Sequence, residues 1–261
     1  MCLILVAWRI SERYPCVIAA NRDEFFARPA EPAHWWQGGE ILAGRDLLAG
    51  GTWLGVTRTG RFAALTNFRG AARRLDAPSR GALVSEILRS EDSVSQVLEH
   101  LGQVGGRYAG FNLMFSDGER LGVYESTTGE RHELAPGIYG LSNHLLDTPW
   151  PKVLNGKSAL ASALNELPET HGILTLLRDD RQADQADLPR TGVSFEWEQL
   201  LSSAFIRAAE YGTRCSTLVL GDDRGEVQFT EWTWDGQGEQ AGYVSETFTR
   251  SPMPNRSHAS T

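Results

Sequence analysis

Short apolar runs rich in β-branched residues open the chain and predict strands. Residues 2–8 and 16–20 are apolar and are joined by a polar turn that contains Pro15, the pattern of a hairpin of buried strands. Glycines then separate further short apolar runs near residues 41–43, 52–57 and 61–67. The first quarter of the chain is therefore expected to be a meander of strands.

Helical periodicity follows and alternates with more strands. Ser79 is a candidate N-cap for a helix that reaches about residue 101 in two pieces, and a second helical region runs from Pro151 to about residue 178. A third helix is expected near residues 197–210. Further hairpins and strands are expected at residues 110–125, 137–142 and 215–234. Strands grouped in hairpins with helices between them indicate antiparallel sheets covered by helices, an α+β fold and not a doubly wound parallel sheet.

One large domain fits the length and the composition. The chain has 261 residues, of which 41% are hydrophobic and 22% charged, and its apolar pattern shows no break between two cores. We therefore expect a single domain over residues 1–248. Residues 249–261 are rich in polar residues and proline and are expected to form a flexible C-terminal tail, because they bury too little apolar surface to order themselves.

The net charge and the cysteine content limit which classes of partner and which cellular compartment are expected. A formal net charge of -8 means that the average surface repels phosphate, so no nucleic acid partner is expected. The densest basic stretch is short and lacks interleaved aromatic residues, so it is expected to be a solvated loop. It consists of Arg69, Arg73, Arg74 and Arg80. No apolar run is long enough for a membrane span, and the N-terminus lacks the order of a signal peptide. Three cysteines, an odd count in a long chain, argue for reduced thiols and hence a cytoplasmic location.

Cys2 draws attention through its position. A methionine before a small residue is normally trimmed, and trimming here would place a thiol and a free amine on one residue. An α-amino group has a pKa of roughly 7.7 to 8.0 and a thiol a pKa of about 8.5, so the amine can serve as the base for the thiol. On position alone, a small buried core residue is the commoner explanation.

Four consecutive polar residues at positions 21–24 change that balance. They directly follow the second apolar run, and in an antiparallel hairpin the end of the second strand lies beside the start of the first, so this cluster should reach Cys2. A cationic Arg22 would favour the thiolate, and Asp23 could hold the amine or a substrate amide by charge-assisted hydrogen bonds. The alternative is a surface ion pair of small energetic value.

These segments resemble a known family. The start Met1–Cys2, the segment Asn21-Arg22-Asp23-Glu24 and the segment Thr66-Asn67-Phe68-Arg69 are similar to those of the NRDE-motif family, also called the transport and Golgi organisation family. Further matches extend the resemblance to about residue 234, at Gly140-Leu141-Ser142-Asn143 and at Tyr211-Gly212-Thr213-Arg214. The family more distantly resembles N-terminal cysteine hydrolases such as bile-salt hydrolase and penicillin V acylase. That resemblance implies a four-layer αββα sandwich, the N-terminal nucleophile hydrolase-like fold.

The distant resemblance also implies roles for single residues. Asn67, after an apolar strand, would supply an oxyanion-hole donor, and Asn143 would line the site as a second asparagine. Arg214 would support the nucleophile, although Arg207 competes for that role. Asp23 is favoured over Glu24 for the aspartate role. For either asparagine alone, a turn residue is the simpler explanation.

Two functions remain from the sequence. The first is an N-terminal cysteine hydrolase that acts on a carbon–nitrogen amide bond, other than a peptide bond, or on a related acyl bond of a small molecule, through an acyl-enzyme on Cys2. The second is a non-catalytic small-molecule carrier on the same scaffold, with haem or a lipid or acyl-CoA as the carried ligand. Neither requires a cofactor, and the six histidines have no metal-ligand spacing, so no metal site is expected.

Overall fold

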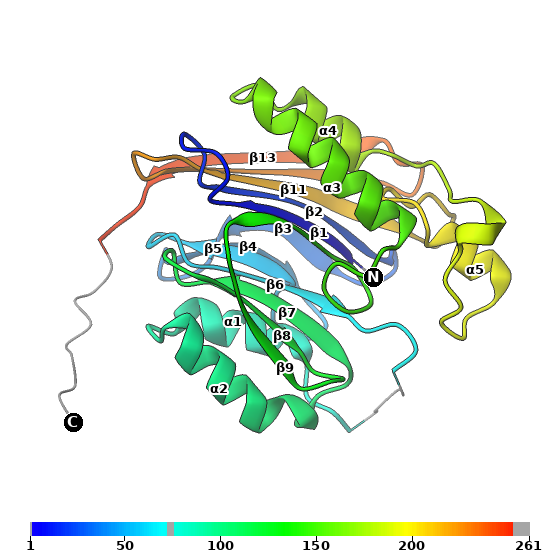
Figure 1. The fold of residues 1–261 in the computed structure, drawn as a ribbon, viewed down its shortest axis with the longest axis horizontal. Helices are drawn as coiled ribbons and strands as arrows, with labels where there is room; N and C mark the ends of the chain where they lie inside the picture. Colours follow the sequence, from blue (N-terminus) through cyan, green and yellow to red (C-terminus); the bar gives the residue numbers. More distant parts are fainter. Residues whose placement is uncertain (1, 72–75, 253–261) are drawn as a thin grey trace.

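The computed structural model describes residues 2–71 and 76–252, which form two antiparallel sheets stacked face to face (Figure 1). The six-stranded sheet has the order β10 (Gly137–Leu141), β1 (Cys2–Trp8), β2 (Cys16–Phe25), β11 (Tyr211–Gly221), β12 (Glu226–Trp234) and β13 (Gln240–Thr249). The seven-stranded sheet follows chain order: β3 (Ala30–Trp35), β4 (Ile41–Asp46), β5 (Leu54–Thr57), β6 (Phe62–Asn67), β7 (Phe111–Ser116), β8 (Leu121–Glu125) and β9 (Glu130–Leu134). Met1, Arg73, Arg74 and residues 253–261 lie outside the described residues.

Helices cover the outer face of each sheet (Figure 1). The seven-stranded sheet carries α1 (Arg80–Arg89) and α2 (Val94–Val104), and the six-stranded sheet carries α3 (Pro151–Ala163) and α4 (His171–Leu177). Shorter helical segments complete the described chain: η1 (Gly105–Arg107), η2 (Leu164–Glu166), η3 (Gln185–Asp187) and α5 (Phe195–Leu200). The layers therefore run helix, sheet, sheet, helix, and the expected α+β fold and αββα sandwich are confirmed.

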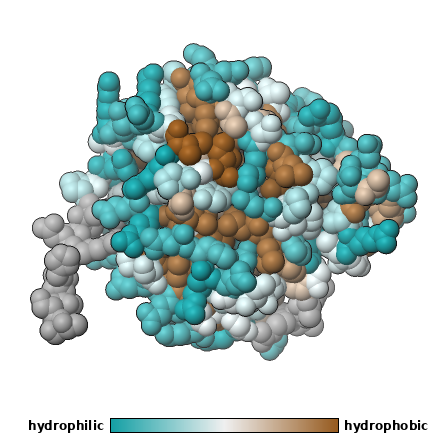
Figure 2. All heavy atoms as spheres, viewed as in Figure 1, coloured by the Kyte–Doolittle hydropathy of each residue, from teal (hydrophilic) through white to brown (hydrophobic). Residues whose placement is uncertain are grey.

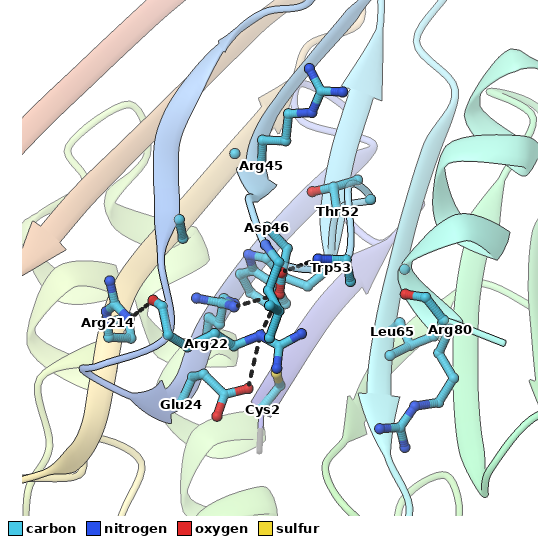
Figure 3. Close-up of a pocket in the computed structure, with 18 of the residues that line it drawn as sticks. Cys2, Arg22, Glu24, Arg45, Asp46, Thr52, Trp53, Leu65, Arg80 and Arg214 are labelled. Carbon is cyan, nitrogen blue, oxygen red and sulfur yellow. Dashed lines mark hydrogen bonds and ion pairs between the residues drawn. The ribbon is translucent and has the colours of Figure 1, made fainter. Parts of the chain in front are cut away.

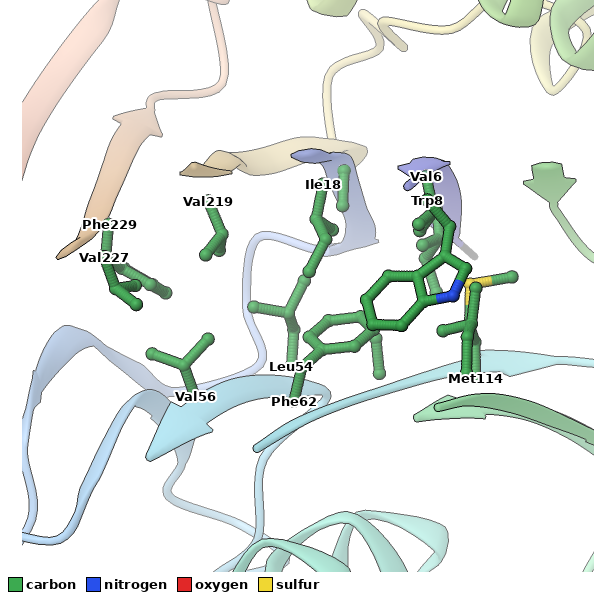
Figure 4. Close-up of a cluster of buried hydrophobic side chains, with 14 of the residues drawn as sticks. Val6, Trp8, Ile18, Leu54, Val56, Phe62, Met114, Val219, Val227 and Phe229 are labelled. Atoms are coloured by element: carbon green, nitrogen blue, oxygen red, sulfur yellow. The ribbon is translucent and has the colours of Figure 1, made fainter. Parts of the chain in front are cut away.

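Three apolar layers hold the sandwich together: one lies between the two sheets, and one lies between each sheet and the helices that cover it. Between the sheets, Trp8 and Ile18 meet Phe62 and Met114 of the opposite sheet (Figure 4). Because successive side chains of a strand point to opposite faces, Leu5 of the same first strand instead packs under α3 and α4. Strand β1 is thus buried on both faces, which explains why its sequence is a continuous apolar run and does not alternate.

The hairpins and most helices follow the sequence expectations. Strands β1 and β2 pair antiparallel, and the expected strands of the first quarter appear as β4, β5 and β6. The expected two-piece helix appears as α1 and α2, and the hairpin around residues 117–118 appears as β7 and β8. The last hairpin turns between β11 and β12 as expected. These elements rest on contacts between neighbours in the sequence, which the apolar pattern records directly.

Other elements differ from the expectations. Strand β2 does not end before the polar residues but continues to Phe25, because β11 pairs with it over that whole length and satisfies its backbone groups. The expected helix over residues 197–210 is wrong beyond Leu200, since the buried apolar residues that follow are irregular. The region from Pro151 forms two helices, with a break that contains Pro168, which has no backbone N–H to donate.

The last described residues are held to the rest of the domain by backbone hydrogen bonds. The expected domain boundary at residue 248 falls inside β13, and Arg250 and Ser251 donate backbone hydrogen bonds to Gly225 and Arg58.

None of the helices in residues 2–71 and 76–252 combines the length and the apolar character needed to cross a bilayer. Apolar side chains gather in the middle of the face drawn in Figure 2, between helix layers whose surface is mainly hydrophilic.

Candidate active site

A cleft of about 740 Å³ opens where the ends of the two sheets meet. Its lining comes from β1, β2, β4, β11, the end of β6 and the start of α1, so that segments far apart in the sequence share it (Figure 3). The lining includes five of the residues singled out from the sequence: Cys2, Arg22, Asp23, Asn67 and Arg214. A volume of this size is typical of sites for small molecules.

Cys2 begins the central strand β1 at the inner end of the cleft. Its side chain is 7% exposed, its cross-strand partner on β2 is Arg22, and its carbonyl oxygen accepts a hydrogen bond from the Ser142 hydroxyl at 3.1 Å. Burial raises the pKa of the Cys2 thiol and the charge of Asp23 adds to this rise, whereas the charges of the N-terminal amine and Arg22 and a hydrogen bond from the backbone N–H of Asp23 act in the opposite direction. The resting thiol is therefore protonated at neutral pH and needs a base to become a nucleophile.

Arg22 links the two sheets across the cleft. Its guanidinium lies 3.4 Å from the carboxylate of Asp46 at the end of β4 (Figure 3). Arg28 lies 2.6 Å from the same carboxylate oxygen. Burial raises the pKa of Asp46, but the hydrogen bonds from Arg28 and the Ala49 N–H, together with the charges of Arg28 and Arg22, outweigh it and hold this pKa below its ordinary value. Arg28 is therefore the closer partner of Asp46, while the charge of Arg22 also acts on the Cys2 thiol.

Asp23 and Glu24 occupy different surroundings although they are neighbours. Asp23 is buried, and its carboxylate accepts a hydrogen bond from the Thr213 hydroxyl at 2.7 Å. Burial raises the pKa of Asp23, and the charge of the N-terminal amine, followed by the charge of Lys152, the Thr213 hydrogen bond and the charge of Arg69, opposes that rise. Glu24 is 25% exposed on the rim and lies 3.9 Å from Arg28. Only Asp23 contacts Cys2, through its backbone N–H.

Asn21, the first residue of the polar segment, faces away from the cleft. Its amide nitrogen donates to the carbonyl oxygens of Leu177 and Ala204, each at 2.8 Å, and its amide oxygen accepts from the Ser216 hydroxyl at 2.6 Å. Asn21 is fully buried under α4. The expectation that all four polar residues reach Cys2 is therefore wrong for Asn21, whose side chain points to the face opposite that of Arg22; Asp23 shares the face of Asn21 but lies nearer the end of the strand, where it lines the cleft.

The two asparagines of the resemblance form a pair. Asn67 ends β6 and lines the cleft. Asn143 is fully buried and stands one layer behind, where its amide nitrogen donates to the Asn67 carbonyl oxygen at 2.9 Å. Its own carbonyl oxygen accepts from the Arg69 backbone at 2.7 Å. Among the described residues that line the cleft, Asn143 is absent; it fixes the main chain that carries Asn67.

The competing arginines lie in separate places. Arg214 sits at a bulge of β11, lines the cleft and donates to the carbonyl oxygens of Phe25, Phe26 and Arg28 at 2.9, 3.3 and 2.8 Å. Arg207 lies outside the described lining and forms an ion pair with Asp180 at 3.1 Å. Of the two, Arg214 belongs to the cleft, where it fastens the connection after β2.

A basic cluster that the sequence placed in a solvated loop is partly buried. Arg69 is 6% exposed and lies 2.8 Å from the carboxylate of Glu198, with its guanidinium over the ring of Trp150. Arg80 is half-buried, lines the cleft and donates to the Gly110 carbonyl oxygen at 3.1 Å. The expectation of a solvated loop is therefore wrong for Arg69 and Arg80, because Arg69 pairs with Glu198 of α5 and Arg80 begins α1 beside the cleft.

Lys152 is a residue that the sequence reasoning missed. It lies in the first turn of α3, is 4% exposed, and has a pKa that burial lowers to about 8, with Asp23 and Cys2 acting in the opposite direction. A lysine in the first turn of a helix is opposed by the helix dipole, so its position was a usable signal of a special environment.

One group of side chains has metal-ligand spacing among the described residues. Glu125, Glu130 and His132 bring their ligand atoms within 4.8 Å of one another on the outer hairpin of the seven-stranded sheet. The sequence spacing alone did not indicate this group. None of the three lines the cleft around Cys2.

The family comparison agrees with the motif. The model of the family described as Transport and Golgi organisation 2 matches residues 1–236. The chain is 38% identical over 238 residues to the Transport and Golgi organization protein 2 homolog of Bos taurus, covering 84% of this chain and 86% of the relative. It is 30% identical over 248 residues to the Transport and Golgi organization protein 2 of Drosophila melanogaster, covering 85% of this chain and 87% of the relative.

Solved structures show a weaker likeness. The C2A mutant of conjugated bile acid hydrolase from Clostridium perfringens aligns with a TM-score of 0.47 and 12% identity, covering 100% of each chain. The Caenorhabditis elegans ortholog of N-acylethanolamine-hydrolyzing acid amidase aligns with a TM-score of 0.44 and 9% identity, covering 84% of this chain and 92% of that one. At these scores the likeness carries no argument about activity.

Proposed function

The chain belongs to the Transport and Golgi organisation 2 family, and we propose that it is an N-terminal cysteine hydrolase that cleaves a carbon–nitrogen amide bond or a related acyl bond of a small molecule. The observation that carries the proposal is the setting of Cys2. This thiol begins a central strand inside a cleft, stands opposite Arg22 and accepts a hydrogen bond from the backbone of Asp23. A cysteine kept only for packing would not need these charged neighbours.

The reaction needs the amine that removal of Met1 would leave on Cys2. This amine takes the proton of the thiol, and the thiolate attacks the carbonyl carbon of the substrate. The tetrahedral intermediate collapses when the protonated amine gives its proton to the leaving nitrogen, which departs as an amine and leaves a thioester on Cys2. Water, deprotonated by the same amine, then attacks the thioester and releases a carboxylic acid and the free thiol.

The neighbouring side chains have separate roles in this scheme. Arg22 stabilises the thiolate, and Asp23 holds the amine of Cys2 by a charge-assisted hydrogen bond. Asn67 donates to the oxygen that becomes negative in the tetrahedral intermediate, and Asn143 holds the main chain of Asn67 in place. Arg214 fixes the connection after β2 and so acts on the site through the backbone.

The lining of the cleft supports a polar substrate of modest size. Arginines and carboxylates both line it. Few large apolar side chains reach it, namely those of Leu48, Trp53 and Leu65. The volume of about 740 Å³ suits a small molecule. A small amide or acyl compound with polar groups on both sides of the scissile bond fits this arrangement.

The test is a labelling and mass experiment on the native protein. We expect the intact mass to show loss of Met1 and, after treatment with a small thiol-reactive acyl probe, one adduct on Cys2. Cys2→Ala should lose the adduct and all turnover of N-acyl amides. Cys16→Ala is the matched control, because Cys16 is a free thiol at the far end of the same hairpin and should leave both unchanged.

The carrier function is the competing outcome of the same experiment. A carrier would retain haem or a long-chain acyl-CoA in a stoichiometric complex, with no turnover and no acyl adduct on Cys2. Haem iron accepts a thiolate ligand, and Cys2 and Cys215 both line the cleft. Retention of Met1, or an adduct that survives in Cys2→Ala, would contradict the hydrolase proposal.

A further inference from the structure

A buried lysine lies behind Asp23 on the helix side of the six-stranded sheet. Lys152 is 4% exposed, and its ammonium has no hydrogen-bond partner among the residues described. Its charge acts on Asp23 and Cys2, which line the cleft, and on Arg69. Burying a cation without a direct partner is unfavourable for folding, so this position needs a reason other than stability.

Close packing of α3 fixes where this lysine lies. A Cβ on Gly156 would come within 2.8 Å of Leu5, and a Cβ on Gly140 would come within 2.7 Å of Val153. These two glycines let α3 lie directly on β1 and β10, and β1 begins with Cys2 at the inner end of the cleft. The first turn of α3 is thereby pressed against the end of the sheet that carries Cys2 and Asp23.

Other charges around Lys152 already have partners. Arg69 is the neighbouring cation, and its guanidinium lies 2.8 Å from Glu198. On the outer side, Lys152 borders a second hollow with charged residues on its rim. There, Asp179 is paired with Arg181 at 2.6 Å, and Asp180 is paired with Arg207 at 3.1 Å. The two remaining carboxylates of this hollow, those of Asp184 and Asp187, are exposed. Asp23 is therefore the buried carboxylate with which the charge of Lys152 interacts most strongly.

We propose that Lys152 is a positioning residue of the cleft, whose ammonium keeps the buried carboxylate of Asp23 ionised so that Asp23 can hold the amine of Cys2. This inference rests on the proposed hydrolase function. Burial alone raises the pKa of Asp23, and a neutral carboxyl group would lose its charge-assisted hold on an ammonium. Lys152 opposes that rise from the side of the sheet away from the cleft, where it does not block the substrate.

The test follows the titration of Asp23 directly. Carbon NMR of protein labelled at the aspartate carboxyl carbons, with the Asp23 signal assigned by Asp23→Asn, gives its midpoint in wild type and in Lys152→Met. We expect the midpoint to rise by about one pH unit or more in Lys152→Met, that is, at least a tenfold change in proton affinity. Methionine matches the length of the lysine stem and packs without a charge, so the variant should fold.

Two further variants bracket this result. Lys157→Met removes a lysine from the same helix that is half-exposed and paired with Asp147 at 2.7 Å, and it should leave the Asp23 midpoint unchanged. Lys152→Arg keeps the charge and should keep a midpoint close to that of wild type. An unchanged midpoint in Lys152→Met would overturn the proposal.

Acylation of Cys2 by the probe, measured against pH in protein that has lost Met1, separates this inference from the proposed function. In Lys152→Met the acid limb of the acylation rate should move to higher pH together with the Asp23 midpoint. A shifted midpoint with an unmoved acid limb would overturn the positioning role. If wild type is not acylated at any pH, the hydrolase proposal fails, and the Asp23 titration still decides whether Lys152 controls its charge.

Discussion

Replacing Asn21 by alanine should destabilise the fold and leave the reactivity of Cys2 intact. The side chain of Asn21 makes three buried hydrogen bonds, to two carbonyl oxygens and one hydroxyl, at 2.6 to 2.8 Å. Alanine removes all three and offers nothing in their place. The prediction therefore separates the first residue of the polar segment, which anchors the sheet to α4, from Arg22 and Asp23, which line the cleft.

The magnitude follows from the two carbonyl oxygens that lose their donor. Each buried polar group left unpaired costs about 1–3 kcal/mol, so the carbonyl groups of Leu177 and Ala204 together account for about 4 kcal/mol. The Ser216 hydroxyl keeps the hydrogen bond that it accepts from Trp234 at 2.9 Å and adds little. For a protein of this length, about 4 kcal/mol corresponds to a fall in Tm of about 10 °C.

Urea unfolding followed by tryptophan fluorescence measures this loss, with Ser216→Ala as a second variant of the same hydrogen-bond network. Ser216→Ala leaves the Asn21 amide oxygen and the Trp234 indole N–H unpaired, so it should cost a comparable amount, about 4 kcal/mol. Labelling of Cys2 by iodoacetamide in folded Asn21→Ala should proceed at the wild-type rate. A loss of stability below about 1 kcal/mol, or a folded variant in which Cys2 no longer reacts, would refute the assignment of Asn21 to the fold.

Two further predictions concern stability. Because burial lowers the pKa of Lys152 from 10.5 to about 8, the unfolded chain binds its proton more tightly, so the free energy of unfolding should rise between pH 8 and 10.5 by about 3 kcal/mol. The difference between wild type and Lys152→Met, measured by urea unfolding across that range, isolates this rise, and a constant difference would contradict the burial of a charged lysine. Gly51→Ala should lower stability by about 1–3 kcal/mol in thermal unfolding, since a Cβ there would lie 2.5 Å from the backbone of Gly81 at the start of α1. Gly106→Ala, where a Cβ meets nothing within 4 Å, is the control, and equal effects of the two substitutions would show that the close contact is unimportant.

The sequence predicted the parts of the fold that depend on local contacts. The apolar run of β1 and its turn into β2 gave the hairpin, and the alternation around residues 117–118 gave the next one. The length of β2 was out of reach, because its polar end is held by β11, whose residues lie nearly two hundred positions later. Strands β3, β9 and β13 at the sheet edges were missed, since their exposed faces are polar and their pattern resembles that of a loop.

The candidate site divides in the same way. Cys2, Arg22 and Asp23 are close because of one hairpin, and their proximity follows from its register. Lys152 comes from a helix in another part of the chain, and no local pattern shows that it faces Asp23. The false helix over residues 201–210 has a related cause: its apolar spacing reflects burial of an irregular segment, which sequence periodicity does not distinguish from the buried face of a helix.

The pairing of β2 with β11 has a consequence for when Cys2 is enclosed. Ser216 and Asn21 are separated by 195 positions, so at a synthesis rate of about 5–20 residues per second the later strand leaves the ribosome roughly 10 to 40 s after the earlier one. During that interval the six-stranded sheet lacks at least β11, β12 and β13, so the sheet around residue 2 is incomplete. We therefore expect the trimming of Met1 that the proposed hydrolase requires to take place on the growing chain, before β11 pairs with β2.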